Sequence, residues 1–176
     1  MRGSVVVASH RPEWGVGIVV SVAGSEARVF FLAGGRRSVD LASGRLSVVQ
    51  ETAAQSEIVA AVARSRPATW ARAHHYVYVI LLSEDVKRRA RFMRENPRMQ
   101  PGMPCVYVGL TGLTPSQRLA NHRMHHKGAR YAGSHGRRLM PLLYERFNPM
   151  PYRVGAAFEP YLAGVLRGKG YGVWQN

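Results

Sequence analysis

Cysteine, acidic side chains and long apolar runs are scarce in this chain of 176 residues. Its lone cysteine, Cys105, excludes an internal disulfide, which fits a reducing compartment. The longest apolar runs, such as YVYVILL at 76–82, have the length of a strand and fall well short of a membrane span. The stretch before Arg11 also lacks the long apolar core of a secretory signal. We therefore expect a soluble cytoplasmic protein with no membrane partner.

Basic side chains far outnumber acidic ones. The chain has 25 Lys and Arg residues against 10 Asp and Glu residues, which gives a formal net charge of +15 and a pI near 11.2. Residues 71–176 hold 17 of the bases and 5 of the acids, so this segment carries +12. Such an excess predicts strong, salt-dependent contact with a phosphate backbone. The expected partner is nucleic acid, and the expected location is the nucleoid.

Residues 1–50 have the pattern of a small β domain. Short runs rich in Val and Phe occupy residues 15–22, 27–32, 36–41 and 45–49, and the turns AGSE, AGG and ASG separate them. This spacing is typical of a small barrel. Residues 51–70 are Ala-rich and predict a helical linker whose helix stops before Pro67.

Residues 71–176 alternate strand and helix patterns, so we expect an α+β chain overall. The expected elements are strands at 76–82, 105–110, 139–147 and 171–176, and helices over 84–95, from Pro115 and within 157–170. The last helix has an apolar face at helical spacing, and this pattern predicts that Pro160 lies in its first turn.

The helix from Pro115 has a clear start signal. Thr114 and Gln117 stand at the spacing of a capping box, with proline at the first helical position. Arg118 and His122 are then four residues apart on one face, and His125 and His126 continue the stripe. Such a stripe can hold phosphate through the guanidinium group, although a solvated basic face is the alternative.

Glu159 is conspicuous because acids are so few. It borders the apolar stripe of the last helix, where a carboxylate can bind Mg²⁺, a metal that keeps several waters. The alternative is a glutamate favoured by the helix dipole. Tyr76 and Tyr78 share one face of their strand, and Tyr107 would bring its hydroxyl close if its strand is adjacent. These tyrosines could equally be core residues.

Residues 74–176 carry a pattern that resembles the GIY-YIG nucleases. The pattern consists of YVY at 76–78, YVG at 107–109, Thr111, Arg118, His122 and Glu159. Its most specific part runs from the second motif, YVG, to His122. This resemblance implies an α/β domain with a central three-stranded sheet flanked by helices. It also implies hydrolysis of DNA phosphodiesters, in double-stranded or branched DNA, with one divalent metal, Mg²⁺ or Mn²⁺.

The resemblance also implies catalytic roles. Glu159 resembles the metal-binding glutamate, and Arg118 resembles the arginine that steadies the scissile phosphate. Tyr78 and Tyr107 match the signature tyrosines, one of which helps to position or deprotonate the attacking water. His122 matches a histidine that joins the acid–base network in some members.

The chain departs from the pattern in three places. Tyr76 stands where the family usually has glycine, and the late asparagine of the family can only be Asn176; both are further catalytic candidates. The stretch between the two motifs is longer than in many members because it includes the basic helix expected over 84–95. Basic residues there and after His122 are candidate DNA contacts: Lys87, Arg88, Arg91, Arg94, Arg123, His125, His126 and Lys127.

Residues 10–41 look like the SH3-like or Tudor-like barrels appended to bacterial helicases and transcription-repair factors. That likeness implies a docking module, for a protein partner or for nucleic acid.

Two main hypotheses follow for the whole chain. The first is a metal-dependent DNA endonuclease with residues 71–176 as the catalytic domain. The second is a noncatalytic basic DNA- or RNA-binding protein that reuses the nuclease fold; a ribosome-associated RNA binder explains the charge but not the Tyr/Arg/Glu arrangement.

Overall fold

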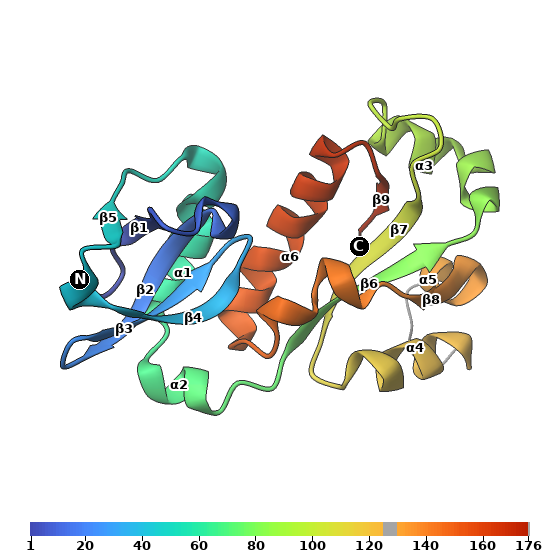
Figure 1. The fold of residues 1–176 in the computed structure, drawn as a ribbon. Helices are drawn as coiled ribbons and strands as arrows, with labels where there is room; N and C mark the ends of the chain where they lie inside the picture. Colours follow the sequence, from blue (N-terminus) through green and yellow to red (C-terminus); the bar gives the residue numbers. More distant parts are fainter. Residues whose placement is uncertain (125–129, 176) are drawn as a thin grey trace. The chain divides into compact units, whose positions relative to one another are not determined.

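The computed structural model describes residues 1–124 and 130–175 and shows a mixed α+β chain, as the sequence patterns predict (Figure 1). Its contacts divide the chain into two compact units. The first comprises Met1–Ala73 and Arg146–Ala157, and the second comprises His74–Glu145 and Phe158–Asn176. Residues 146–157 thus group with the N-terminal residues, whereas composition had suggested one continuous segment from residue 71. No helix in the described residues is long and apolar enough to cross a membrane.

An antiparallel sheet forms the centre of the first unit, in the strand order β4-β3-β2-β1-β5. The strands are β1 (Val5–Ala8), β2 (Val16–Ala23), β3 (Glu26–Phe31), β4 (Gly35–Asp40) and β5 (Leu46–Val48). One face of the sheet carries a buried cluster that includes Val29 and Phe31, with Trp14 half-buried against it. Alternation along β3 turns Phe30 to the other face, where the rings of Trp70 and Phe147 pack at 5.5 and 6.4 Å.

Helices and turns complete the first unit. The expected helix within 51–70 is present as α1 (Ser56–Arg64), which buries one apolar face. A second short helix follows, α2 (Pro67–Ala71), which has proline at its first position. Short 3₁₀ turns occupy Pro12–Trp14, Leu41–Ser43 and Ala53–Gln55.

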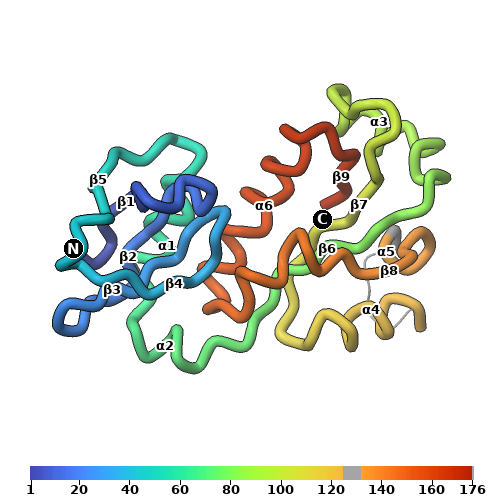
Figure 2. Tube along the Cα trace, in the orientation of Figure 1, coloured from blue at the N-terminus to red at the C-terminus, as the bar shows by residue number. Residues whose placement is uncertain are grey.

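A second sheet, in the order β8-β6-β7-β9, lies at the centre of the second unit. Its strands are β6 (Tyr76–Leu82), β7 (Cys105–Thr111), β8 (Gly136–Leu139) and β9 (Gly172–Trp174). Strand β6 is antiparallel to β7 and β8, and β7 is parallel to β9, so the chain's last strand lies beside β7 (Figure 2). The helices are α3 (Ala90–Glu95) against β9, and α4 (Pro115–Arg123) and α5 (Arg130–His135) against β6 and β8. Helix α6 (Tyr152–Gly168) belongs to this unit from Phe158 onward, and its first turns group with the first unit.

Several expectations for this unit are wrong. The sheet has four strands instead of three, because residues 136–139 pair with the free edge of β6. The strand expected over 139–147 stops at Leu139, since Pro141 begins the first of two 3₁₀ turns, Pro141–Leu143 and Glu145–Phe147. The helix expected over 84–95 is broken at Arg89, whose extended backbone separates a 3₁₀ segment, Glu84–Arg88, from α3.

The last helix also begins earlier than expected. Because α6 starts at Tyr152, Pro160 lies well inside the helix and not in its first turn. Proline has no N–H for the carbonyl of Ala156. Both residues are exposed, so water can satisfy that carbonyl.

Asn96 joins the end of α3 to β9. Its buried side-chain amide donates to the carbonyls of Phe92 and Val173, at 2.8 and 3.0 Å, and accepts from the Val173 N–H at 2.7 Å. The edge strand β9 therefore has hydrogen-bonded partners on both sides, in β7 and in Asn96. This arrangement fixes the backbone just before the chain's last residues.

Candidate active site

Two tyrosines meet on neighbouring strands of the second unit. Antiparallel pairing sets Tyr78 of β6 opposite Gly109 of β7, and Tyr107 follows two residues back along β7. Both side chains are buried, with ring centroids 5.9 Å apart. A Cβ on Gly109 would lie 2.7 Å from Tyr78 Oη and 2.8 Å from Tyr107 Cε1. Gly109 therefore leaves the space in which the two phenol rings meet.

Helix α4 brings a histidine to these rings. The capping box is formed as its residues predict: the Gln117 N–H donates to Thr114 Oγ1 at 3.3 Å, and the Thr114 N–H donates to Gln117 Oε1 at 3.1 Å. This start places His122 on the helix face that packs on the sheet. His122 is 1% exposed, and its ring centroid lies 6.0 Å from that of Tyr78 and 5.8 Å from that of Tyr107.

A buried hydrogen bond joins Tyr78 Oη to His122 Nε2 at 2.9 Å. Burial, and then the positive charge of Arg118, lower the pKa of His122 to about 4. The imidazole is therefore neutral at physiological pH. Arg118 also hydrogen-bonds Tyr78, and a guanidinium group can only donate. The Arg118 guanidinium and the Tyr107 hydroxyl both donate to the Tyr78 oxygen and fill its two acceptor positions, so the single proton of Tyr78 is directed to His122 Nε2.

Both phenols are protonated at neutral pH. Burial raises the pKa of Tyr78, and hydrogen bonding to Arg118 and Tyr107 together with the charge of Arg118 opposes part of that rise. Burial also raises the pKa of Tyr107, and the neighbouring Tyr78 adds to the effect. Of the two hydroxyls, that of Tyr78 is the one whose ionised form Arg118 and Tyr107 both favour.

Glu159 of α6 belongs to the same group of side chains. Its charge raises the pKa of both Tyr78 and Tyr107, so its carboxylate is within electrostatic range of the two phenols. Burial raises the pKa of Glu159 itself, and a hydrogen bond with Gln175 opposes that shift. The structure therefore brings together the five residues to which the sequence assigned catalytic roles: Tyr78, Tyr107, Arg118, His122 and Glu159. We call this set the tyrosine cluster.

Gln175 is a residue that sequence reasoning missed. It follows β9 directly and hydrogen-bonds Glu159. Its position next to Asn176, a catalytic candidate from the GIY-YIG resemblance, is the sequence feature that could have pointed to it. Asn176 itself lies outside the described residues. Tyr76 is half-buried opposite Thr111, two residues before Tyr78 on β6.

Two buried nitrogen atoms of the tyrosine cluster are unsatisfied. Arg118 Nε and His122 Nδ1 have no hydrogen-bond partner within residues 1–124 and 130–175. A buried polar atom without a partner costs roughly 1–3 kcal/mol, and proteins pair most such atoms.

The basic residues expected to contact DNA have mixed surroundings. Three of those within 84–95 pair with acids of the same segment: Lys87 with Glu84, Arg88 with Asp85 at 3.8 Å and Arg91 with Glu95 at 2.7 Å. Exposed pairs of this kind are weak and can exchange for phosphate. Arg94 is exposed, and Arg123 donates to the Arg137 carbonyl at 2.6 Å. His125, His126 and Lys127 lie outside the described residues.

The donor set of the tyrosine cluster suits a hard cation that keeps water ligands. Glu159 is the cluster's single carboxylate, and the described part of the chain holds no group of three His, Cys, Asp or Glu side chains placed to bind a metal ion. Mg²⁺ commonly binds through one or two carboxylates together with substrate phosphates and waters. A lone glutamate is therefore compatible with Mg²⁺ or Mn²⁺ as the metal, with water filling the other positions.

Comparison with known proteins concerns the first unit. Residues 1–49 match the model of a family described as "Protein of unknown function (DUF3553)". No curated protein and no solved structure matches the chain. The family match covers the antiparallel sheet β4-β3-β2-β1-β5 and stops before α1, so the tyrosine cluster stands on its geometry alone.

Proposed function

We propose that the chain is a divalent-metal-dependent DNA endonuclease and that its second unit is a GIY-YIG-type domain. The observation that best supports this function is the 2.9 Å hydrogen bond between Tyr78 and His122. It belongs to a group that also holds the buried Tyr107 and the half-buried Arg118, with Glu159 in electrostatic range. These are the residue types that phosphodiester hydrolysis uses.

Hydrolysis at phosphorus needs an oriented water, neutralisation of the equatorial oxygens and help for the leaving alkoxide. Tyr78 orients and activates the water: the Tyr78 oxygen accepts a proton from the water while the phenol's own proton moves to His122 Nε2. The resulting hydroxide attacks phosphorus, the P–O bond to the leaving alkoxide breaks, and the alkoxide takes a proton from water. The bound phosphate's negative charge favours the imidazolium form, which offsets the lowered pKa of His122. Arg118 neutralises the equatorial oxygens, because its guanidinium group can donate to two phosphate oxygens at once.

A bound Mg²⁺ or Mn²⁺ would neutralise charge on the phosphate and the leaving oxygen. Glu159 is the residue that would hold it. Only the ionised carboxylate binds a metal, so the raised pKa of Glu159 makes metal affinity fall as the pH drops. Gln175, which hydrogen-bonds Glu159, orients the carboxylate.

The first unit serves as a docking module in this proposal. Its five-stranded antiparallel sheet, with Trp14 packed on the buried cluster, is compatible with an SH3-like or Tudor-like barrel. Such a module positions the nuclease on nucleic acid or on a protein partner.

One observation favours the noncatalytic alternative. Tyr78, Tyr107 and His122 are 1–3% exposed, which is the burial of core residues. A basic DNA- or RNA-binding protein that keeps this cluster only for packing would show the same burial.

Cleavage of supercoiled plasmid and of branched DNA separates the two functions. Glu159→Gln removes the charge and keeps the shape, and the exposed Glu145→Gln is the matched control. We expect nicking with Mg²⁺ or Mn²⁺ that EDTA abolishes, that Glu159→Gln loses and that Glu145→Gln retains, with DNA affinity equal in all three proteins. Binding without cleavage of any substrate by the wild-type chain would establish the noncatalytic binder.

A further inference from the structure

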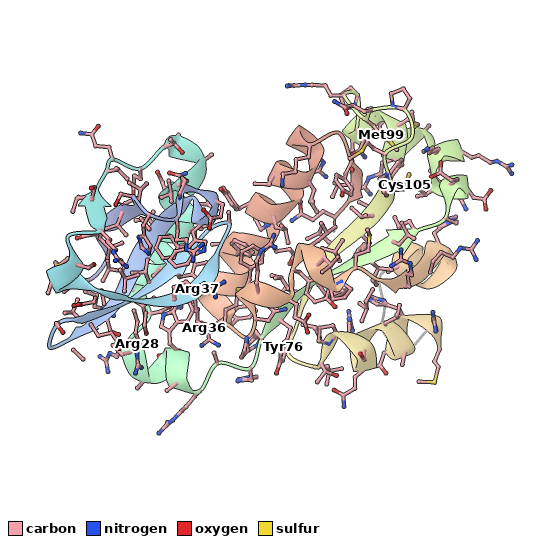
Figure 3. The ribbon with its side chains drawn as sticks, in the orientation of Figure 1. Arg28, Arg36, Arg37, Tyr76, Met99 and Cys105 are labelled. Carbon is pink, nitrogen blue, oxygen red and sulfur yellow. The ribbon has the colours of Figure 1, made fainter. Side chains whose placement is uncertain are left out.

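The first unit contains a basic pocket of about 550 Å³. It is formed by residues of β2, β3, β4 and α2 and by the segment that holds Arg146 and Asn148, all within the first unit. Four of its lining residues are arginines, namely Arg28, Arg36, Arg37 and Arg146, and among the residues that the structure describes no aspartate or glutamate lines it. Figure 3 labels the three that lie on β3 and β4.

Strand register explains why Arg28 and Arg36 share a face. Arg28 lies opposite Ser21 on β2 and opposite Ser38 on β4, so a polar row crosses three strands. Arg36 lies two residues before Ser38 and opposite Phe30, which puts it on the same face as Arg28. A register shift between Val19 and Ser21 brings Ser21 into this row.

An apolar wall stands beside the arginines. Trp70 and Pro67 of α2 line the pocket, and the Trp70 ring packs on Phe30 at 5.5 Å between centroids. Guanidinium groups beside a fixed apolar surface suit a nucleotide, whose phosphate and sugar–base parts have these two kinds of chemistry. The volume is that of a small-ligand site.

Of the arginines on β3 and β4, Arg28 and Arg36 are the most available to bind a ligand, given the interactions that each residue already makes. Arg28 Nε lies 3.8 Å from Glu26 Oε1 in an exposed pair, which phosphate can displace. Arg36 has no ion pair within the part of the chain that the structure describes. Arg37 instead donates to the Arg36 carbonyl at 3.0 Å, and its guanidinium carbon lies 5.4 Å from the Trp14 ring centroid.

We propose that this pocket binds a nucleotide of single-stranded nucleic acid, with Arg28 and Arg36 holding its backbone phosphate. A recessed site admits a base and sugar that are splayed out of a helix, which a single strand presents and an intact duplex does not. The first unit as a whole has eleven arginines and five acidic residues, so its net charge also favours a polyanion. The site is independent of the proposed cleavage chemistry.

Fluorescence anisotropy of a labelled single-stranded oligonucleotide tests the pocket, with the full chain in EDTA so that cleavage plays no part. The pocket variant is Arg28→Ala/Arg36→Ala. The control is Arg45→Ala/Arg66→Ala, which removes the same charge from exposed positions that do not line the pocket. We expect roughly tenfold weaker binding in the pocket variant and a much smaller change in the control. The slope of log affinity against log salt should flatten by about 0.7 for each lost phosphate contact.

Equal weakening in the two variants would mean that total charge alone matters, and it would overturn the proposal. Unchanged binding in the pocket variant would also overturn it. Arg28→Lys/Arg36→Lys keeps the charge and should bind with intermediate affinity, because lysine lacks the two-pronged contact. Thermal unfolding checks that every variant folds. This assay contains no cleavage step, and cleavage with metal is measured separately on supercoiled plasmid, so failure of the nuclease proposal and failure of the pocket proposal give different results.

Discussion

Tyr78 Oη and His122 Nε2 lie 2.9 Å apart, in a hydrogen bond that joins a strand to a helix 44 residues later in the chain. Both groups are almost fully buried, so neither can turn to water if the other is lost. The bond is therefore part of the fold as well as of the proposed chemistry. Measurements of stability and of cleavage can be made on the same variants.

Tyr78→Phe should destabilise the second unit by roughly 1–3 kcal/mol, because it leaves His122 Nε2 buried without a partner. Urea unfolding measures the loss. Tyr161→Phe is the control, since Tyr161 is only half-buried, and it should change stability by much less. Equal stability of Tyr78→Phe and the wild type would show that the hydrogen bond contributes nothing. Cleavage should be lost in Tyr78→Phe and kept in the control.

Gly109→Ala should be strongly destabilising for a different reason. The added methyl would lie 2.7 Å from Tyr78 Oη and 2.8 Å from Tyr107 Cε1, and both rings are packed in the core. Overpacking of this kind costs about 1–3 kcal/mol. Gly164→Ala in α6 is the matched control, because no atom lies within 4 Å of its added Cβ. That variant should gain up to about 1 kcal/mol through helix propensity. Similar melting temperatures for the two variants would contradict the close approach at Gly109.

The free energy of unfolding should decrease as the pH falls, because His122 binds a proton more readily in the unfolded chain. Its pKa is about 4 in the folded chain and near 6.5 when unfolded, so between these values the unfolded chain binds the extra proton. The contribution is fully present above pH 6.5 and is lost as the pH falls to about 4, by roughly 3 kcal/mol in total. Urea unfolding of wild type and His122→Gln across this range measures it.

The difference between those two proteins should shrink as the pH falls. Glu159 acts in the opposite direction, since its raised pKa makes the folded state bind a proton more readily, but it is present in both proteins and cancels. Parallel stability curves would mean that His122 titrates normally.

Asn96→Ala should detach β9 from α3. The substitution removes three hydrogen bonds and leaves the buried Val173 N–H without its side-chain acceptor, for a loss of about 2–4 kcal/mol. Asn96→Asp keeps the acceptor for Val173 but sets a buried carboxylate oxygen against the carbonyls of Phe92 and Val173, so it should be at least as destabilising as the alanine variant. Hydrogen exchange at Val173 reports the effect directly. Unchanged protection in Asn96→Ala would show that pairing with β7 alone holds the strand.

Local sequence determined those features that depend on neighbouring residues. Thr114, Pro115 and Gln117 fix the start of α4 through contacts across three positions, so the helix and the shared face of Arg118 and His122 follow from the sequence. Alternation likewise gives the strand that holds Tyr78, and composition gives the charge.

Tertiary structure decided everything that depends on register and burial. Gly109 matters because it lies opposite Tyr78, and no local pattern contains that pairing. Gln175 reaches Glu159 because β9 pairs with β7, and Arg28 and Arg36 share a face through the register of β3 and β4. Pro160 stays inside α6 because it and Ala156, whose carbonyl it leaves without an N–H, both lie on the exposed side of the helix. These features arise between residues far apart in the chain, whose contacts form only when the whole sheet closes, so the free energy that selects them is absent from any short stretch of sequence.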